Sequence, residues 1–354
     1  MNDDDAIALL ESMLAIPSVS GDEARLAAFL VQEMGRRGFA AHVDGAGNAV
    51  GEIGAGPAAV VLLGHLDTVP GAIPVRREAG RLYGRGAVDA KGPLAAFIAA
   101  GARLHAARRL PGRVIVIGCV EEEVPSSRGA QYVLSRYRPA ACIVGEPSGV
   151  DGITLGYKGV LRATLRLEQA AQHSAHAGPT VAARACAVWQ QIADAAARFN
   201  AARPRAFDQL LPALLRIHSG SDGRRDWAEL QINLRLPPDL PPDAAGSWLH
   251  DPAPDGTLTV QGATPAWAGA RTTPLHRALA QAIRAQGGTP RYLLKTGTAD
   301  LNVVAPAWGC PALAYGPGEA ALDHTPDEHI RLADYRRGIA TLERALTAYL
   351  NEPR

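Results

Sequence analysis

The stretch Gly64-His65-Leu66-Asp67-Thr68-Val69-Pro70 begins where a run of apolar residues, 58–63, ends. Such a run predicts a buried strand. In open α/β sheets the ligand site lies beyond the carboxyl ends of the strands, which is where this polar stretch falls. His65 is of a residue type that often binds metal ions, and Asp67 is spaced to hold or orient it. The stretch therefore predicts an α/β sheet with a metal site at its edge, if later strands also end in ligands.

Later strands do end in residues that can bind metal. Strands expected at 113–120, 140–144 and 311–315 are followed by acidic residues or a histidine. Asp89 precedes a small-residue helix at about 93–108, where a helix cap is its commonest role. Taken singly, each such residue is more often a surface acid, a cap or a loop histidine. Because several strands place them on one rim of one sheet, we expect a single cluster, formed by His65, Asp89, Glu122, Glu123, Glu146 and His324.

Nitrogen and oxygen ligands without cysteine suit zinc, or cobalt and manganese as substitutes. Two such ions, about 3.5–4 Å apart, can share a carboxylate and a water, lower the pKa of that water and stabilise an oxyanion. A further carboxylate, not bound to metal, is needed to move a proton from the water to the leaving nitrogen. Glu122 and Glu123 are adjacent at a strand end and point in different directions, so one can bind metal while the other is the base.

Composition limits the function classes. The chain of 354 residues is long enough for a sizeable core and two domains, and its net charge of +1 gives no argument for a nucleic-acid or membrane partner. No apolar run approaches the roughly 20 residues of a membrane span, and the acidic start is unlike a signal peptide. We therefore expect a cytoplasmic protein. Its four cysteines are expected to be buried, reduced thiols: Cys119, Cys142, Cys186 and Cys310.

Hydrophobic periodicity places the remaining elements of the first domain. It predicts helices at 7–13, 23–37 and 274–286 and strands at 39–43 and 49–53. The turn Gly45-Ala46-Gly47-Asn48 invites a dinucleotide-binding interpretation, but G-x-G-x-x-G needs glycine where Val50 stands, so a hairpin turn is the better interpretation.

The strand pattern changes near Tyr157. Alternating residues predict half-exposed strands at 160–168 and 229–236, with a helix at 181–200 between them and a last strand at 256–260. A β-α-β-β insert is the simplest explanation of this change.

Five motifs follow one another along the chain: H-x-D at His65, G-R-G-x-x-D-x-K-G ending at Gly92, E-E at Glu122, G-E-P at Gly145 and H-T-P-D-E from His324. In this order they resemble the dinuclear zinc aminoacylases and carboxypeptidases, a family that includes acetylornithine deacetylase, succinyl-diaminopimelate desuccinylase and carboxypeptidase G. The resemblance covers nearly the whole chain. It implies an α/β fold with a zinc-exopeptidase-like catalytic domain, 1–156 and 265–354, built on a mixed, largely parallel sheet. It also implies an inserted α+β, ferredoxin-like lid and dimerisation domain, 157–264.

The resemblance also implies roles for single residues. Two divalent ions, zinc or alternatively cobalt, would be held by His65, Asp89 as the bridge, Glu123, Glu146 and His324. Asp67 would orient His65, and Glu122 would be the general base. Glu121 would be the acidic residue that precedes the pair.

The segment 172–178 resembles a lid motif whose histidine reaches the active site of the partner subunit in a homodimer, where it helps to stabilise the oxyanion. The register favours His176 for this role, with His173 as second choice.

One subgroup of the family is closer than the others. The segments 295–302 and 315–318 resemble the hydrolases of carrier-protein-dependent lysine biosynthesis. These enzymes release lysine, or ornithine in the arginine branch, from the terminal glutamate γ-carboxyl of a small acidic carrier protein. The resemblance implies this carrier as partner and substrate. Candidates for binding the released lysine or ornithine are Lys295, Thr296, Gly297, Asp300, Asn302, Gly316 and Gly318.

Charge in the insert is consistent with an acidic partner. The segment 157–236 carries eleven basic and six acidic side chains, a difference of five, in a chain of net charge +1. Such a surface would steer an acidic protein. Arginines spread over a solvated surface explain the count nearly as well.

The sequence thus predicts a cytoplasmic, homodimeric, two-metal amidohydrolase that acts on carrier-bound lysine or ornithine. Two alternatives stay open. The same metals and base would serve a deacetylase for N-acetyl-ornithine or N-acetyl-lysine, or a small-peptide carboxypeptidase. A protein of another class, which binds metal or carrier without catalysis, is disfavoured because Glu122 accompanies the full ligand set.

Overall fold

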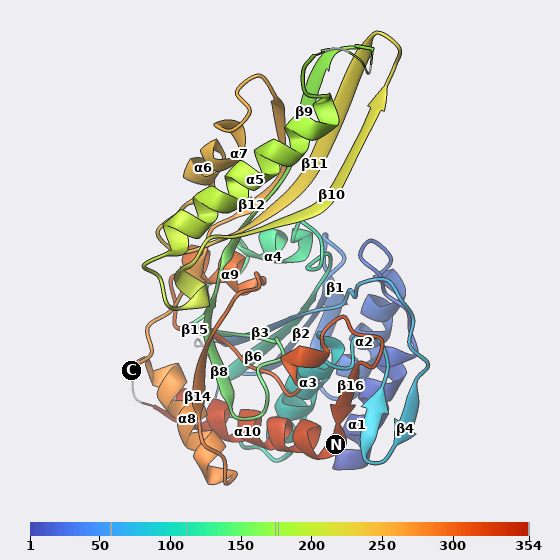
Figure 1. Cartoon of the computed structure of the whole chain (residues 1–354). Helices are drawn as coiled ribbons and strands as arrows, with labels where there is room; N and C mark the ends of the chain where they lie inside the picture. The colour runs from blue at the N-terminus through green and yellow to red at the C-terminus, as the bar shows by residue number, and fades with distance from the viewer. Residues whose placement is uncertain (57–58, 111, 174, 176, 353–354) are drawn as a thin grey trace. The chain divides into compact units, whose positions relative to one another are not determined.

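The computed structural model describes residues 1–56, 59–110, 112–173, 175 and 177–352. The chain forms two compact units (Figure 1), and each is described by itself. The first consists of Met1–Gly156, Gly269–Leu294 and Ala299–Arg354, and the second of Tyr157–Ala268 and Lys295–Thr298.

The first unit is built on a mixed sheet. Its strands lie in the order β1-β2-β6-β3-β7-β15-β8, with β14 also paired to β8. The neighbours β6, β3, β7 and β15 are parallel, and the pairs at the edges are antiparallel. This confirms the predicted α/β class with its mixed, largely parallel sheet. The strands are β1 (Ala40–Val43), β2 (Ala49–Gly54), β3 (Ala59–His65), β6 (Arg113–Cys119), β7 (Ala141–Val144), β8 (Gly152–Tyr157), β14 (Arg291–Lys295) and β15 (Ala312–Ala314).

The register of the parallel strands positions the site. His65 at the end of β3 lies opposite Cys119 at the end of β6. Val144 at the end of β7 lies opposite Leu63 of β3 and Ala314 of β15. The carboxyl ends of four strands therefore meet at one edge of the sheet, and the residues that follow them gather there. All seven residues of β3 are buried, as its uninterrupted apolar run predicts.

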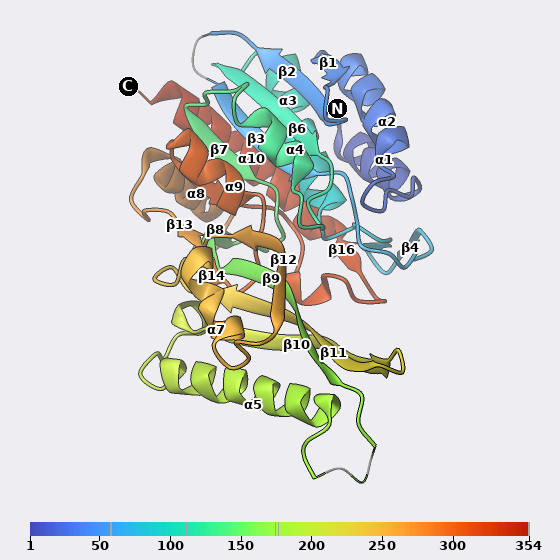
Figure 2. The same cartoon turned by 90° about the horizontal axis from the view of Figure 1, so that it is seen from above.

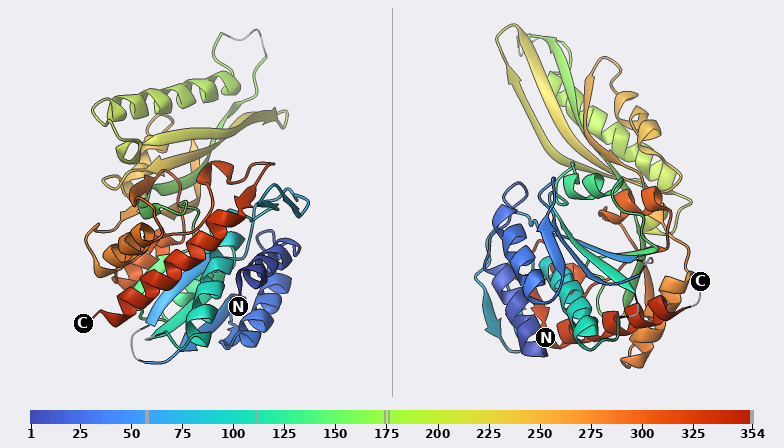
Figure 3. Two further views of the ribbon diagram at one scale, coloured as in Figure 1. Left: turned by 90° about the horizontal axis from the view of Figure 1, so that it is seen from below. Right: turned by 180° about the vertical axis from the view of Figure 1, so that it is seen from behind.

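Helices cover both faces of this sheet. On one face α3 packs on β3, β2 and β6, and α10 runs beside α3 and α8 (Figure 3). On the other face lie α4 against β6 and α9 against β15. The helices are α1 (Asp3–Leu14), α2 (Ala24–Arg36), α3 (Lys91–Ala106), α4 (Arg128–Val133), α8 (Pro274–Ala285), α9 (Leu301–Trp308) and α10 (Leu332–Asn351).

A small antiparallel sheet flanks the site, in the order β16-β5-β4. Its strands are β4 (Arg76–Glu78), β5 (Arg81–Tyr83) and β16 (His329–Arg331). The chain leaves β5 directly into the segment that carries Asp89, and it enters β16 directly from the segment that carries His324.

The second unit is an α+β sandwich. Its sheet has the order β10-β11-β9-β12 with every pair antiparallel. The helix α5 lies along one face (Figure 2) and buries Val188 and Ile192 there. This strand order is that of a ferredoxin-like unit. The elements are β9 (Gly159–Ala170), α5 (Val181–Asn200), β10 (Leu211–Ser221), β11 (Arg225–Leu236), α6 (Pro242–Ala245), α7 (Ser247–His250), β12 (Thr257–Thr264) and β13 (Trp267–Ala268).

The hairpin interpretation of Gly45-Ala46-Gly47-Asn48 is confirmed, because β1 and β2 pair antiparallel around it. Asp44 stabilises the turn by accepting the backbone N–H groups of Ala46 and Asn48.

The prediction of four buried thiols is wrong for Cys186, which is exposed, and for Cys310, which is half-buried. Cys186 lies on α5, which buries only one stripe against its sheet, and the neighbouring Ala185 occupies that stripe.

Among the described residues, no helix combines the length and the apolar character that crossing a membrane requires.

Candidate metal centre

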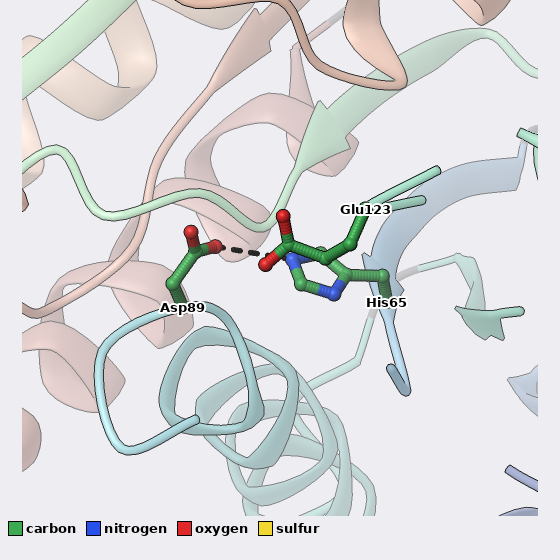
Figure 4. A group of neighbouring side chains, drawn as sticks. All are labelled: His65, Asp89 and Glu123. Atoms are coloured by element: carbon green, nitrogen blue, oxygen red, sulfur yellow. Dashed lines mark hydrogen bonds and ion pairs between the residues drawn. The ribbon is translucent and has the colours of Figure 1, made fainter. Parts of the chain in front are cut away.

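Three side chains of the first unit form a compact group at the sheet edge: His65, Asp89 and Glu123 (Figure 4). One ligand atom of each lies within 4.8 Å of those of the other two. His65 Nε2 is 3.1 Å from Asp89 Oδ1. His65 ends β3, whereas Asp89 precedes α3 and Glu123 follows β6, so strand ends and a helix start supply the group.

His324 joins this group from the segment before β16. Its Nε2 lies 2.9 Å from Glu123 Oε1 and 3.1 Å from Asp89 Oδ2. Hydrogen bonds to Asp89 and Glu123 raise the pKa of His324 to about 10. The residue has φ of 59°, a left-handed conformation that is costly for a side chain other than glycine. Strained conformations of this kind persist where the surroundings enforce them, most often at functional sites.

Asp89 lies between the two histidines, with one carboxylate oxygen facing each. Burial opposes its ionisation, but the hydrogen bonds from His324 and His65 outweigh burial and hold the pKa of Asp89 well below its usual value. The simpler interpretation of Asp89 as a helix cap is wrong, because Ala90 is the N-cap of α3 and no side chain caps it.

The tautomer of His65 follows from its partners. Its Nδ1 lies 2.8 Å from the backbone carbonyl of Asp67, an acceptor, so Nδ1 carries the proton. The lone pair of Nε2 then faces the Asp89 carboxylate. Burial disfavours the imidazolium, but hydrogen bonds to Asp67 and Asp89 raise the pKa of His65 well above its usual value. His65 Nε2 and Asp89 Oδ1 would then face each other with lone pairs at 3.1 Å. This arrangement requires a cation between them, either a proton or a metal ion.

The Asp67 carboxylate contacts chiefly the segment after β6. Its Oδ1 accepts the backbone N–H of Glu122, and its Oδ2 accepts that of Glu123, each at 3.0 Å. The Ser20 hydroxyl donates to Oδ2 at 2.6 Å. The carboxylate is 3.5 Å from His65 Nδ1, whereas the Asp67 carbonyl holds that nitrogen at 2.8 Å. Asp67 thus anchors the glutamate pair as well as His65, and Ser20 is a supporting residue that we did not predict from sequence.

The three successive glutamates point to different surroundings. Glu121 turns away and accepts from Ser126 at 2.6 Å and from Arg128 at 2.7 Å. Glu123 reaches His324. For Glu122, burial raises the pKa of the carboxyl well above its usual value, and the nearby Glu146 carboxylate raises it further. A perturbed acid beside a ligand cluster is a candidate for proton transfer.

Glu146, after β7, is 7% exposed and does not belong to the group of three. Its charge acts on Glu122, which places both carboxylates in one neighbourhood.

The donor set fits divalent metal ions. Tetrahedral zinc with ligands about 2.0–2.1 Å away separates neighbouring ligand atoms by about 3.4 Å, and the three nitrogen–oxygen separations in the cluster are 2.9–3.1 Å. One oxygen of Asp89 is directed to each histidine, so this carboxylate could be shared by two ions. The donors are imidazole and carboxylate without thiolate, as zinc, cobalt or manganese sites use.

The predicted substrate contacts fall in different surroundings. Asp300 is 1% and Asn302 2% exposed, and Asn302 Oδ1 accepts the Ala299 N–H at 3.1 Å. Burial raises the pKa of Asp300 to about 7. A Cβ on Gly316 would come within 2.6 Å of Pro93, and one on Gly318 within 3.0 Å of Val88, so both glycines allow close packing on the start of α3 and the loop before it. Their contact with a substrate stays a prediction.

The other candidates belong to the second unit: Lys295, Thr296 and Gly297. Lys295 Nζ lies 5.7 Å from the centre of the Tyr157 ring. His176, the predicted oxyanion residue, lies outside the described residues. His173, the second choice, is exposed, and its Nδ1 accepts the Ala175 N–H at 3.2 Å.

The basic character of the insert is weaker than the segment count suggests. Several arginines are paired, among them Arg184 with Asp255 and Arg203 with Asp239, two acids that lie beyond position 236. Over the whole second unit, twelve basic side chains stand against ten acidic ones, a difference of two. Net charge alone therefore gives little support to steering of an acidic partner.

Known proteins resemble this chain over nearly its whole length. A "[LysW]-lysine hydrolase" from Deinococcus radiodurans is 48% identical over 345 residues, which cover 96% of this chain and 95% of that protein. A "Putative [LysW]-lysine/[LysW]-ornithine hydrolase" from Thermococcus kodakarensis is 38% identical over 343 residues, 97% of this chain and 91% of that protein.

Solved structures show the same fold. The M20 family metallo-carboxypeptidase Sso-CP2 from Sulfolobus solfataricus superimposes with a TM-score of 0.83 at 19% identity, covering 99% of this chain and all of that one. The YXEP protein of Bacillus subtilis, a dinuclear metal-binding peptidase, gives a TM-score of 0.70 at 14% identity, covering 98% of this chain and 97% of that one. The model of peptidase family M20/M25/M40 matches residues 61–348. Five motifs in one order, the shared fold, the close relatives and this match agree, and the chain belongs to peptidase family M20/M25/M40.

Proposed function

We propose that this protein is a metal-dependent amide hydrolase that releases lysine, or ornithine, from the terminal glutamate γ-carboxyl of an amino-group carrier protein. The observation that carries the proposal is that Glu122 lies near side chains of the types that bind metal, in a chain 48% identical to a [LysW]-lysine hydrolase. A non-catalytic binding protein would not need an acid with a raised pKa at this position.

The proposal assigns a role to each residue of the candidate metal centre. His65, Asp89, Glu123, Glu146 and His324 would hold two divalent ions, zinc or alternatively cobalt. When bound, the ions supply positive charge for a developing oxyanion and lower the pKa of a water. Asp67 fixes the backbone of Glu122 and Glu123. The Glu123 carboxylate could then bind a metal ion while the Glu122 carboxylate does not.

Glu122 is proposed as the general base. Its carboxylate takes a proton from the attacking water and delivers it to the α-nitrogen of the departing amino acid as the C–N bond breaks and the C–O bond forms. Burial disfavours the charged form of Glu122 and raises its pKa, which strengthens the carboxylate as a proton acceptor. Proton transfer by one positioned acid contributes typically about 10²–10⁴-fold in rate.

The second unit is proposed as a lid through which two copies associate. His176 of each copy would help to stabilise the oxyanion in the other. Residues of 295–302 and the glycines Gly316 and Gly318 are proposed to contact the released amino acid, and the protein is proposed to act in the cytoplasm.

A side-by-side hydrolysis assay tests the substrate class. Metal-loaded protein should release lysine or ornithine from carrier-γ-glutamyl-lysine or carrier-γ-glutamyl-ornithine, and the ratio of kcat/KM values gives the side-chain preference. Free N-acetyl-lysine and N-acetyl-ornithine, assayed in parallel, should be poorer substrates because they lack the carrier. Turnover of the acetylated amino acids without any release from the carriers would contradict the proposal and identify a general deacylase.

A further inference from the structure

Glu328 is a fully enclosed carboxylate near the candidate metal centre. Its side chain is 0% exposed. Oε1 accepts the backbone N–H groups of Val88 at 2.9 Å and Asp89 at 3.1 Å. Oε2 accepts the backbone N–H of Gly86 at 3.1 Å and an Arg85 guanidinium N–H at 2.9 Å. All four of these partners are donors, so the carboxylate acts as an acceptor only.

These contacts fix the whole segment that carries Asp89. The Glu328 backbone carbonyl also accepts the Gly84 N–H at 3.3 Å, so a single residue binds the segment at both of its ends. The same segment leads into α3, because the Gly86 carbonyl accepts the Lys91 N–H at 2.9 Å. Arg85 also connects this segment to the loop at Gly71, since its Nε donates to the Gly71 carbonyl at 3.0 Å.

These contacts determine the position of Asp89. Its backbone N–H is held by Glu328, and its two carboxylate oxygens face His65 and His324, each 3.1 Å away. His324 lies only four positions before Glu328, so one segment supplies both the anchor for the Asp89 backbone and a partner for its side chain. A shift of the backbone at Asp89 would move both oxygens relative to both histidines.

We propose that Glu328 is a positioning residue whose carboxylate holds Asp89 in the orientation in which one carboxylate can serve two metal ions. This inference rests on the proposed function, because it assigns Glu328 to the metal centre of that reaction. The Glu328 carboxylate accepts hydrogen bonds from backbone N–H groups and from Arg85, so it would act through the Asp89 backbone. Residues that only support a metal ligand typically affect metal affinity or activity by about 10–100-fold when they are changed.

Glutamine is the informative replacement. Glu328→Gln keeps the shape and retains one acceptor oxygen, but its amide NH₂ must face donors on the other side. If the oxygen stays with Val88 and Asp89, the NH₂ meets the Gly86 N–H and the Arg85 guanidinium, and buried donors are then left unpaired. We therefore expect the segment 84–89 to loosen while the apolar core is unchanged.

The test measures metal binding and local hydrogen exchange on the full-length apo protein. Co²⁺ is titrated and its visible absorption recorded, and exchange is followed for peptides that cover 84–90 and, for comparison, β3. Glu328→Gln should bind Co²⁺ about 10–100-fold more weakly than wild type. It should also show an altered Co²⁺ spectrum and faster exchange at 84–90, with β3 still protected. Glu78→Gln, an exposed acid on β4 paired with Arg76, is the matched control and should behave as wild type.

The outcomes separate this inference from the proposed function. Wild-type protein that binds no Co²⁺ would overturn the metal centre itself. If the wild type binds Co²⁺ and Glu328→Gln shows the same affinity, spectrum and exchange, the role of Glu328 alone is overturned. If Glu328→Gln does not fold, Glu328→Asp keeps an acceptor-only group that is one methylene too short, and it should show the same local loosening and weaker binding. Unchanged binding in that variant would equally overturn the proposal.

Discussion

Glu122→Gln should lower kcat by about 10²–10⁴-fold, the contribution that a positioned general base makes, while metal content stays at the wild-type value. Glutamine has the same shape but cannot accept a proton at neutral pH. Its backbone N–H can still bind Asp67, so the neighbouring Glu123 should keep its place. The measurement is steady-state hydrolysis combined with elemental analysis of the dialysed protein.

The neighbouring residue provides a matched control. Glu121→Gln changes the same charge one position earlier, but its carboxylate contacts Ser126 and Arg128 instead of the cluster. We expect that variant to remain active. An inactive Glu121→Gln together with an active Glu122→Gln would show that the base has been assigned to the wrong glutamate.

Asp89→Asn should remove metal from the protein and abolish turnover with it. An amide supplies one neutral oxygen and one NH₂, so it cannot present an acceptor to both histidines or be shared by two ions. The loss of affinity should exceed the about 10–100-fold that changes in merely supporting residues produce. Metal content after dialysis against a weak chelator measures the loss.

The control for Asp89→Asn is Asp4→Asn, which alters the same charge on an exposed residue of α1 whose side chain is 90% accessible. Full metal content in Asp89→Asn would contradict the assignment of Asp89 as the shared ligand.

Much of the fold is local in origin and could be predicted. β3, β6, β7 and β15 are short apolar runs, and the four-strand parallel centre of the sheet follows from them. The helix α5 has the predicted bounds because Thr180 caps its start and its apolar residues recur at helical spacing. Strand ends then place His65, Glu123 and Glu146 at one edge without any knowledge of packing.

Other elements carry weaker signals. We did not predict β10, and its residues are mostly exposed, so the alternation that marks a half-buried strand is missing. β10 forms because it pairs antiparallel with β11, a tertiary contact that its own residues do not reveal. We also did not predict α10, although Ile339, Leu342 and Leu346 recur there at helical spacing.

The finer structure of the site could not be predicted because it rests on contacts between distant segments. Glu328 and Asp89 are 239 positions apart and meet through a backbone N–H, which leaves no signature in residue type. The same holds for Asp67 and the N–H groups of Glu122 and Glu123. Sequence patterns identify the side chains that can do chemistry, whereas contacts such as these between side chains and distant backbone N–H groups emerge only from the fold.

The most direct test of the central claim is lysine release from carrier-γ-glutamyl-lysine before and after removal of metal from the purified protein. We expect release by the metal-loaded protein, loss of release after chelation, and recovery on addition of Zn²⁺ or Co²⁺. Release that persists at the same rate in metal-free protein, or no release from the carrier at any metal loading, would contradict the account.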